Sequence, residues 1–324
     1  MYEEAETLDD LLRKVFEKLA KVSFDISATR GRFSEVAGVL LRLRNPRARL
    51  SRTEDRGKPF SALGEMLWYF TKSNDLGFIE YYLPKYRNES DDGKTVYGGY
   101  GPRLFKMHSK IDQIGNVVNL LKARPTSRRA VVQLFDSNDI NGHVSTHPKD
   151  IPCTCTIQFL IRDNRLLAHS SMRSNDAYFG LPHDVFSFTM IQEMIASELK
   201  IEVGDYTHTV GSLHLYEDKK EKVLEFLDEG WQATDKPMPK MPAGDPFGSV
   251  ATLLKLENLI RERKDPDIDG SPLDEYWKDL VKLLQILRLV KDKDVAKVQL
   301  IKNSMSTKVY SAYIDQKLAD TKSS

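Results

Sequence analysis

The apolar residues of the N-terminal third recur three or four positions apart over several stretches. This spacing predicts helices over 8–19, 62–70 and 107–121, because it lines one face of a helix. The segment 28–50 is rich in Arg and contains two glycines, and it predicts short strands and a mobile loop. The segment 87–103 combines glycine, proline and clustered polar residues, and it predicts a loop.

From residue 130 the pattern changes to one that is typical of strands. Strands are predicted over 130–135 and 207–215. The runs 154–162 and 165–172 are joined by Asp163-Asn164, a dipeptide that suits a two-residue hairpin turn. We therefore expect these two runs to form an antiparallel pair.

Helical patterns return in the C-terminal half. An apolar run over 185–195 predicts a buried helix, and leucine-rich runs over 249–263 and 273–291 predict two more after a proline-rich link. The tail ends in polar residues and is predicted to fray. The chain is thus expected to have an α+β fold, with one domain over 1–240 and a helical extension over 241–324 packed on it.

The chain has 324 residues, of which 40% are hydrophobic, and this is enough for one large core with a small appendage. The formal net charge of +1 gives no overall basic field, so we expect neither a nucleic-acid nor a membrane partner. The sequence has no apolar run near ~20 residues, and its acidic start is unlike a signal peptide. Cys153 and Cys155, the two cysteines, lie too close in sequence for an ordinary disulfide. These features favour a reduced, cytoplasmic protein.

Cys153 follows Pro152 at the start of a predicted strand, where the backbone is stiff. As a thiolate, a cysteine is a strong nucleophile, provided that nearby cations lower its pKa. The alternative is a structural thiol, because unbridged cysteines are among the most buried residues. Cys153 alone does not decide between the two roles.

Three further segments are dense in polar chemistry. The stretch 172–184 places a cation, a hydroxyl, an amide and carboxylates between an apolar strand and an apolar helix, where a purely solvated loop is uncommon. Arg128 and Arg129 form a basic pair, which alone would be an ordinary surface feature. His214 and Tyr216 alternate on a predicted strand, so both side chains face one side of it.

Together these segments resemble the thymidylate synthase family over roughly residues 8–230. The shared motifs are Pro-Cys followed by a strand with Gln-Phe, then Arg-Ser-x-Asp-x-x-x-Gly, and then His-x-Tyr. Glu65 in Gly-Glu-Met-Leu-Trp and Tyr97 in Val-Tyr-Gly match two more. All of them occur in the family's order and at similar spacing. The resemblance implies a mixed sheet with packed helices and makes 1–240 the catalytic domain.

The resemblance also implies a reaction. Cys153 adds to C6 of a pyrimidine nucleotide, and C5 then takes a one-carbon unit from 5,10-methylenetetrahydrofolate, with no metal. Glu65 organises proton transfer at the base. The implied nucleotide ligands are Arg30, Arg128, Arg129, Gln158, Arg173, Ser174, Asp176, Gly180, Asp184, His214 and Tyr216. The implied folate contacts are Glu65, Tyr97, Asp176 and Gly180.

Several of the implied nucleotide ligands are arginines, and their guanidinium groups can hold a phosphate dianion and favour a nearby thiolate. In the family the arginine pair that matches Arg128 and Arg129 comes from the other subunit. The resemblance therefore implies a homodimer with shared active sites.

Asp184 stands where thymidylate synthases carry an asparagine that recognises uracil. A carboxylate accepts from the amine at C4 of cytosine but cannot donate to O4 of uracil, and such mispairing in a buried pocket costs about 1–3 kcal/mol. Asp at this position resembles the deoxycytidylate and cytidylate hydroxymethylases. The alternative is an aspartate that caps the following helix.

A second departure concerns the shielding of the site. Asp150 replaces an apolar residue of the synthases, and no tryptophan lies between residues 68 and 231, where synthases shield the one-carbon intermediate for hydride transfer. Tyr81, Tyr82 and Tyr86 could replace part of that shield. A wetter site would let water attack the intermediate and give a hydroxymethyl product.

The sequence thus predicts 5-hydroxymethylation of cytidylate, CMP or dCMP, through a Cys153–C6 adduct. The alternative within the family is a thymidylate synthase that methylates deoxyuridylate. A third interpretation is a catalytically idle homologue that binds a nucleotide or RNA as a regulator, and the intact Cys153, Glu65 and Arg173 argue against it. The sequence does not distinguish ribose from deoxyribose.

Overall fold

The computed structural model describes residues 1–28, 31–51, 59–146, 148–230 and 237–322. Within these residues seven strands form one mixed sheet in the order β1-β3-β7-β6-β5-β4, with β2 paired to β3. The strands are β1 (Tyr2–Ala5), β2 (Ile26–Ala28), β3 (Gly31–Leu43), β4 (Val131–Gln133), β5 (Thr154–Arg162), β6 (Arg165–Asp176) and β7 (Glu202–Tyr216). The pairs β1–β3 and β6–β7 are parallel, and the other pairs are antiparallel.

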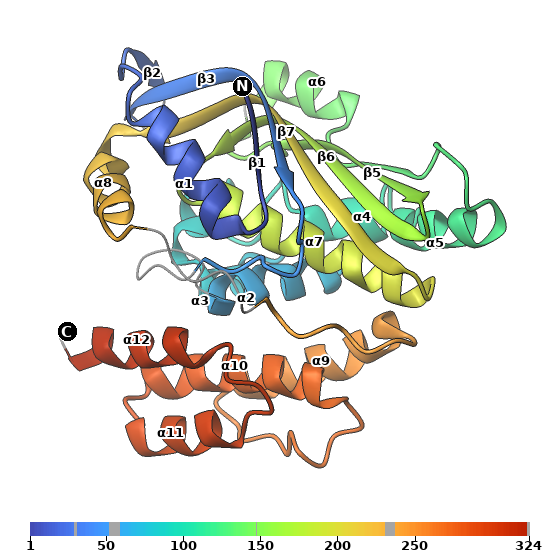
Figure 1. Ribbon diagram of the computed structural model, residues 1–324, viewed down its shortest axis with the longest axis vertical. Helices are drawn as coiled ribbons and strands as arrows, with labels where there is room; N and C mark the ends of the chain where they lie inside the picture. Colours follow the sequence, from blue (N-terminus) through green and yellow to red (C-terminus); the bar gives the residue numbers. More distant parts are fainter. Residues whose placement is uncertain (29–30, 52–58, 147, 231–236, 323–324) are drawn as a thin grey trace.

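Helices cover the sheet and extend below it (Figure 1). In the described residues they are α1 (Leu8–Leu19), α2 (Pro59–Phe70), α3 (Leu76–Tyr82), α4 (Tyr100–Phe105), α5 (Gln113–Ala123), α6 (Ser137–Thr146), α7 (Gly180–Glu198), α8 (Lys220–Asp228), α9 (Pro246–Arg261), α10 (Glu275–Lys291), α11 (Val295–Ser304) and α12 (Ser311–Lys322), with 3-10 turns η1 (Pro84–Glu89) and η2 (Glu217–Lys219). Not one of these described helices combines the length and the apolarity that a bilayer crossing requires. The expected α+β class, a mixed sheet with packed helices, is confirmed.

Helix α7 is the centre of the core. Nearly every one of its residues is buried, because it packs against β6 and β7 on one side and against α2 and α9 on the other. Figure 1 shows it between the sheet and the helices below it. A helix that is apolar on all faces is stable only when it is covered in this way. Most polar side chains on α7 are therefore held in a dry environment, whereas His183 and Glu198 are partly exposed.

The β5–β6 hairpin sets the position of Cys153. Asp163 and Asn164 form its turn with φ angles of 49° and 56°, a left-handed conformation that these two residue types tolerate. This confirms the predicted hairpin. Because the strands run antiparallel, the start of β5 lies beside the far end of β6, where the backbone N–H of Arg173 donates to Cys153 O at 2.8 Å.

In three neighbouring strands, the side chains that point into the core switch from one set of alternate residues to the other, at about the same level of the sheet. The alternation of buried residues shifts by one position in β3 at Gly38, in β7 at Gly211 and in β6 near Arg173. Gly38 has a φ of 65°, and a Cβ on Gly211 would lie 2.8 Å from Arg173 O, so both positions require glycine. The shift turns Asn175 into the core and leaves His214 on the opposite face.

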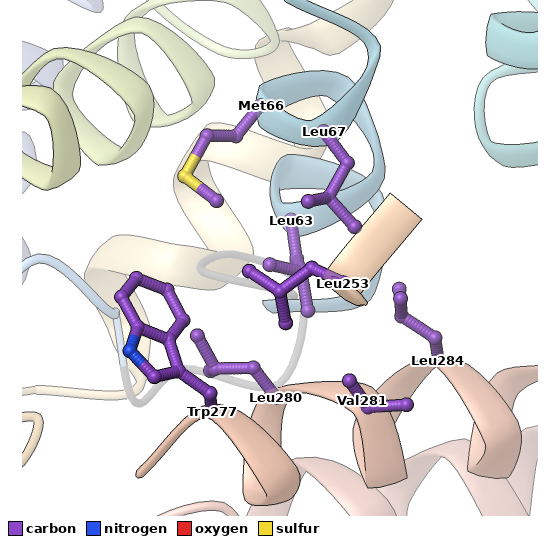
Figure 2. Close-up of a pocket in the computed structure, with 8 residues that line it drawn as sticks. All are labelled: Leu63, Met66, Leu67, Leu253, Trp277, Leu280, Val281 and Leu284. Atoms are coloured by element: carbon purple, nitrogen blue, oxygen red, sulfur yellow. The ribbon is translucent and has the colours of Figure 1, made fainter. Parts of the chain in front are cut away.

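The four helices α9 to α12 form a layer on the side of α2 that faces away from the sheet (Figure 1). Figure 2 shows the seam between them. It is lined by Leu63, Met66 and Leu67 of α2, Leu253 of α9, and Trp277, Leu280, Val281 and Leu284 of α10. The layer thus buries one face of α2. The predicted division of the chain near residue 240 stays a prediction.

The segment 28–50 differs from its prediction. Its described part contains the last residue of β2, the long continuous strand β3 and the turn residues 44–50, in place of several short strands. β3 pairs with β1 and β2 along one edge and with β7 along the other. The pairings with β1 and β7 join distant parts of the chain, so no local pattern predicts them.

The predicted helix over 107–121 begins only at Gln113. The Asp112 side chain caps it by accepting from the backbone of Gly115, and residues 107 and 111 pair as an isolated bridge before it. The predicted loop over 87–103 also contains the first turn of α4.

The described part of the tail beyond α10, residues 292–322, forms α11 and α12, where fraying was predicted. Tyr310 and Ile314 are almost fully buried, and the Tyr313 hydroxyl donates to the backbone carbonyl of Ser51. The prediction failed because few apolar residues hold this segment, and their partners lie far away in the sequence.

Candidate active site

Cys153 lies where β5 begins beside the end of β6. Besides its backbone bond to Cys153, Arg173 donates from its guanidinium to Pro152 O at 3.0 Å and to Ile151 O at 2.9 Å. The guanidinium is thereby fixed over the two residues that precede Cys153. A positive charge in this place favours the thiolate form of a nearby cysteine.

Cys155 has a different environment, although it is only two residues away. Burial raises the pKa of the Cys155 thiol, and the hydrogen bond and charge of Arg173 offset only part of that effect. The two cysteines do not form a disulfide. Because a thiol with a raised pKa is a weak nucleophile at neutral pH, Cys153 is the better candidate.

Glu65 points from α2 into the same region and is 5% exposed. The Tyr86 hydroxyl donates to its Oε1 at 2.5 Å, and His183 Nδ1 lies 2.7 Å from its Oε2. His183 Nε2 lies 3.2 Å from Ser61 Oγ. Burial raises the pKa of Glu65, but the hydrogen bond and charge of His183, with the bond from Tyr86, outweigh it and bring the pKa below its usual value. Glu65 is therefore ionised at neutral pH and can accept a proton.

Asp184 lies one turn inside α7, where the N-cap residue is Phe179, so it is not the cap of that helix. Asn175 Nδ2 donates to Asp184 Oδ2 at 2.7 Å. A Cβ on Gly180 would lie 2.8 Å from that Nδ2, so glycine is required beside this bond. Burial raises the pKa of Asp184 well above its usual range and the charge of Glu65 adds to the effect, which together favour a protonated carboxyl.

A buried chain of polar groups continues from Asn175 into the sheet. Asn175 Oδ1 lies 3.2 Å from His208 Nε2, and His208 Nδ1 lies 2.9 Å from Ser170 Oγ and 2.8 Å from the Tyr206 hydroxyl. His208 is 1% exposed, and burial lowers its pKa to about 3, so the ring is neutral at neutral pH. The chain connects the interior of the sheet with Asp184.

Tyr100 connects the two candidate groups Cys153 and Asp184. Its hydroxyl accepts from Thr154 Oγ1 at 2.9 Å and from Thr154 N at 3.2 Å. Burial raises the pKa of this hydroxyl, and negative charges on Asp184 and Cys153 raise it further. Because Glu65 in turn acts on the pKa of Asp184, the three predicted catalytic residues lie within electrostatic reach of one another.

Ser174, His214 and Tyr216 form a second group, beyond the shift at Gly211. Ser174 Oγ lies 3.4 Å from His214 Nδ1, and the rings of His214 and Tyr216 meet edge to face with centroids 5.1 Å apart. His214 and Tyr216 share one face of β7, as the sequence predicted. Hydroxyl and imidazole groups so arranged can bind the hydroxyls of a sugar.

Asp176 ends β6 and shapes the turn into α7. Its Oδ1 accepts from the backbone N–H of Tyr178 at 2.7 Å and of Phe179 at 3.1 Å. Its charge also contributes to the raised pKa of Asp184, so it borders the same site.

An aromatic surface lies next to this turn. Phe179 is 41% exposed, with Lys85 Nζ at 4.2 Å and Lys219 Nζ at 5.7 Å from the centroid of its ring. An exposed ring flanked by two cations suits a flat ligand that carries carboxylates.

Two predicted ligands are not brought to this site. Gln158 pairs with His169 and thus lies on the face of the sheet opposite Ser170, and its amide donates to Arg128 O at 2.9 Å. The predicted place of Gln158 in a base pocket with Asp184 is therefore corrected.

Tyr97 is the second of these residues. It is 40% exposed and packs on Arg103, whose guanidinium lies 5.4 Å from the ring centroid. Burial raises its pKa, and a hydrogen bond with Asp139 contributes. Tyr97 therefore lies beside Arg103 and Asp139 and does not join the group around Glu65.

The arginine pair also lies away from Cys153 within one chain. Arg128 and Arg129 are exposed just before β4, and the antiparallel register with β5 sets Arg129 about level with Leu160. At ~3.3 Å for each strand residue, Arg129 is roughly 20 Å from Cys153 along the sheet. Arg30 lies outside the described residues.

Four residues of the site were not singled out from the sequence: Asn175, His183, His208 and Tyr86 as a partner of Glu65. Asn175 and His183 lie in the polar stretch 172–184, so its unusual density pointed to them. His208 had no such marker, because its link to Asp184 arises only when β7 lies beside β6.

This chain is similar to known proteins. The family model described as thymidylate synthase matches residues 51–246. A deoxyuridylate hydroxymethyltransferase of Bacillus phage SP01 is 31% identical over 218 residues, which cover 63% of this chain and 56% of the relative. The match thus spans little more than half the length of that relative.

Proposed function

We propose that this chain, which belongs to the thymidylate synthase family, hydroxymethylates C5 of a cytidine nucleoside monophosphate. The one-carbon donor in this proposal is 5,10-methylenetetrahydrofolate, and no metal takes part. The observation that carries the proposal is the buried Asp184, whose raised pKa favours the protonated carboxyl.

The protonated state of the Asp184 carboxyl supports cytosine as the base. When a thiolate adds to C6, negative charge develops on the ring, and N3 of cytosine needs a proton to receive it. A protonated Asp184 can supply that proton from one oxygen and accept from the C4 amine with the other. N3 of uracil already carries a proton, so it has less need of an acid at this position.

A second candidate is hydroxymethylation of deoxyuridylate, because the phage relative carries that name. The sequence argument against uracil assumed an ionised Asp184. A protonated Asp184 can donate to O4 and accept from N3–H, so uracil also meets two hydrogen bonds. The choice between the bases then depends on which oxygen of Asp184 holds the proton.

The surroundings of Glu65 support a hydroxymethyl product. Of the three tyrosines that could shield the site, Tyr86 contacts Glu65, whereas the Tyr82 hydroxyl donates to Glu257 at 2.7 Å in the C-terminal layer. The charge of Asp150 reaches Tyr86 and raises its pKa further, after burial and Glu65. Carboxylates and a hydroxyl so placed can hold a water molecule, and the ionised Glu65 can accept its proton when it adds to the activated one-carbon group.

In this proposal the chain supplies a nucleophile, a cation that supports its thiolate form, a phosphate site and a sugar site. The Cys153 thiolate forms a bond to C6, and Arg173 favours that thiolate and binds phosphate. Ser174, His214 and Tyr216 bind the phosphate and the sugar. Adding water in place of hydride leaves the folate at the tetrahydro level, so the reaction needs no oxidant or reductant.

The aromatic surface at Phe179 fits the folate. Its flat ring systems can stack on Phe179, and its glutamate carboxylates can pair with Lys85 and Lys219. Asp176 and Gly180 border this surface. When bound there, the folate supplies the one-carbon unit.

The distance between the arginine pair and Cys153 supports a homodimer. Arg128 and Arg129 could complete the phosphate site only from a second subunit, since they lie roughly 20 Å from Cys153 in their own chain. The proposal also includes a cytoplasmic location, as the sequence predicted.

A product assay tests the proposal. The purified protein is incubated with methylenetetrahydrofolate and, in separate reactions, CMP, dCMP, UMP and dUMP. We expect mass spectrometry to find 5-hydroxymethylcytidylate without any rise in dihydrofolate absorbance. Asp184→Asn should shift the preference toward uridylate. Thymidylate with dihydrofolate from dUMP would overturn the proposal and leave a thymidylate synthase.

A further inference from the structure

We propose that His208 and Asn175 are positioning residues that fix which oxygen of Asp184 carries its proton, and that they thereby decide which pyrimidine base the site accepts. This inference rests on the proposed function, because it assigns base recognition to Asp184. It adds two residues that touch no part of the nucleotide.

The first step is the direction of each hydrogen bond. Asn175 Nδ2 can only donate, so Asp184 Oδ2 must accept at their distance of 2.7 Å. The same amide presents Oδ1 to His208 Nε2 at 3.2 Å, and this oxygen can only accept. His208 Nε2 must therefore carry the ring proton, and Nδ1 must be the acceptor on the other side.

The second step is what holds His208 in that tautomer. Ser170 Oγ at 2.9 Å and the Tyr206 hydroxyl at 2.8 Å both lie within reach of Nδ1, and they lie 2.7 Å from each other. One hydroxyl therefore donates to the other, and the second donates to Nδ1. Because burial keeps the ring neutral, only one nitrogen carries a proton. A hydroxyl donor at Nδ1 and the amide oxygen of Asn175 at Nε2 together direct that proton to Nε2.

The hydrogen-bond directions in this chain cannot easily reverse. Ser170, His208 and Asn175 are each at most 3% exposed, so water cannot substitute for a lost partner. Turning the amide of Asn175 over would place its oxygen against Asp184 Oδ2 and its NH2 group against His208 Nε2–H. Both contacts would then be mismatched unless protons moved along the whole chain.

The consequence reaches the substrate through Asp184. The carbonyl-type oxygen of a neutral carboxyl is its stronger acceptor, so the bond from Asn175 to Oδ2 favours the proton on Oδ1. N3 and the substituent at C4 are neighbours on the base, so the two oxygens face one of them each. A proton held on one oxygen fits one base, and a proton on the other oxygen fits the other base. The relay therefore makes Asp184 selective, whereas without it the proton could occupy either oxygen.

The test measures discrimination rather than activity alone. His208→Leu removes both ends of the relay, whereas His208→Gln keeps an N–H donor toward Asn175 and an acceptor toward Ser170 and Tyr206. Dissociation constants for CMP and UMP are measured by calorimetry, and kcat/KM for each nucleotide is measured by product formation. We expect His208→Leu to reduce the ratio between the two nucleotides by about ten- to a hundredfold, the effect of one mispaired buried hydrogen bond. His208→Gln should keep the ratio within about threefold of the parent.

Some outcomes would overturn the inference. A folded His208→Leu variant that weakens both nucleotides equally would show that the histidine only supports the core. If His208→Leu does not fold, the double variant Ser170→Ala/Tyr206→Phe, which removes both hydroxyls near Nδ1, is used instead. An unchanged ratio between the two nucleotides in that variant would also overturn the inference. Tyr206→Phe alone is the matched control, because Ser170 still donates, and its ratio should stay unchanged.

These results are separable from those of the proposed function. The product of the parent protein decides which base and which product are correct. The ratio tests the relay whichever base the parent prefers, and the binding constants need no turnover.

Discussion

Replacing His208 with glutamine should make the fold less sensitive to acid. In the folded protein burial lowers the pKa of His208 to about 3, against 6.5 for an ordinary histidine. Above pH 6.5 the ring is neutral in both the folded and the unfolded chain, so its full contribution to stability is present. Between 6.5 and about 3 only the unfolded chain binds the proton, so stability falls as the pH falls.

The size of the effect follows from the two pKa values. At 1.36 kcal/mol for each pKa unit, lowering the pH from 8 to 5 should cost the folded state about 2 kcal/mol through His208 alone. Asp184 acts in the opposite direction. Its pKa is raised in the folded protein, so its contribution falls as the pH rises above 3.8. Because Asp184 is present in both proteins, its effect largely cancels in the comparison.

The assay is urea unfolding of the parent and of His208→Gln at pH 8 and at pH 5, at one protein concentration. We expect the parent to lose about 2 kcal/mol more than the variant between these pH values. His169→Gln serves as the control. His169 is only half-buried, so its protonation should contribute much less to the loss of stability between pH 8 and pH 5. If the parent and His208→Gln lose stability in parallel, His208 is not the buried neutral group that this reasoning requires.

Three further predictions concern the reaction. Cys153→Ala should abolish release of the C5 proton from labelled nucleotide while Cys155→Ser loses little, because only Cys153 is expected to be the nucleophile; the reverse result would mean that the wrong cysteine is named. A mixture of Arg128→Ala/Arg129→Ala chains with Cys153→Ala chains should regain activity as mixed dimers form, and a folded mixture without activity would count against shared sites. His183→Phe should lower kcat about tenfold to a hundredfold with little change in KM, since it removes a partner of Glu65, the proposed proton acceptor. Because His183 lowers the pKa of Glu65, its loss should also shift the pH dependence of kcat to higher pH. An unchanged pH profile would contradict the role of His183 as a partner of Glu65.

Much of the site could be predicted because its residues lie in short motifs. Cys153 and Asp184 are marked by their neighbours in the sequence, and the hairpin turn at Asp163-Asn164 fixes where the first of them lies. Gln158 shows the limit of this approach. Strand alternation directs its side chain to the face away from Asp184. A sequence motif can single out a residue such as Gln158. The face of β5 on which its side chain lies depends on the strand register and on the bulge near Cys155.

The rest of the site could not be predicted because it depends on contacts between distant strands and helices. His208 reaches Asn175 only because β6 and β7 run parallel with these residues near the shift in side-chain alternation. His183 differs, since it directly precedes Asp184, and it acquires a function only when α2 brings Glu65 to it. Long-range pairing also explains why β3 looked like short strands in the sequence.

The seam between α2 and the C-terminal layer connects the helix that carries Glu65, the proposed proton acceptor, with the last quarter of the chain (Figure 2). One face of α2 presents Glu65 to the site, and the other packs Leu63 and Leu67 against α10, so both faces belong to one rigid element. A chain shortened to the family-matched residues 51–246 would leave that apolar face in water. Protein engineers who transplant this site onto another scaffold therefore need to carry the layer with it.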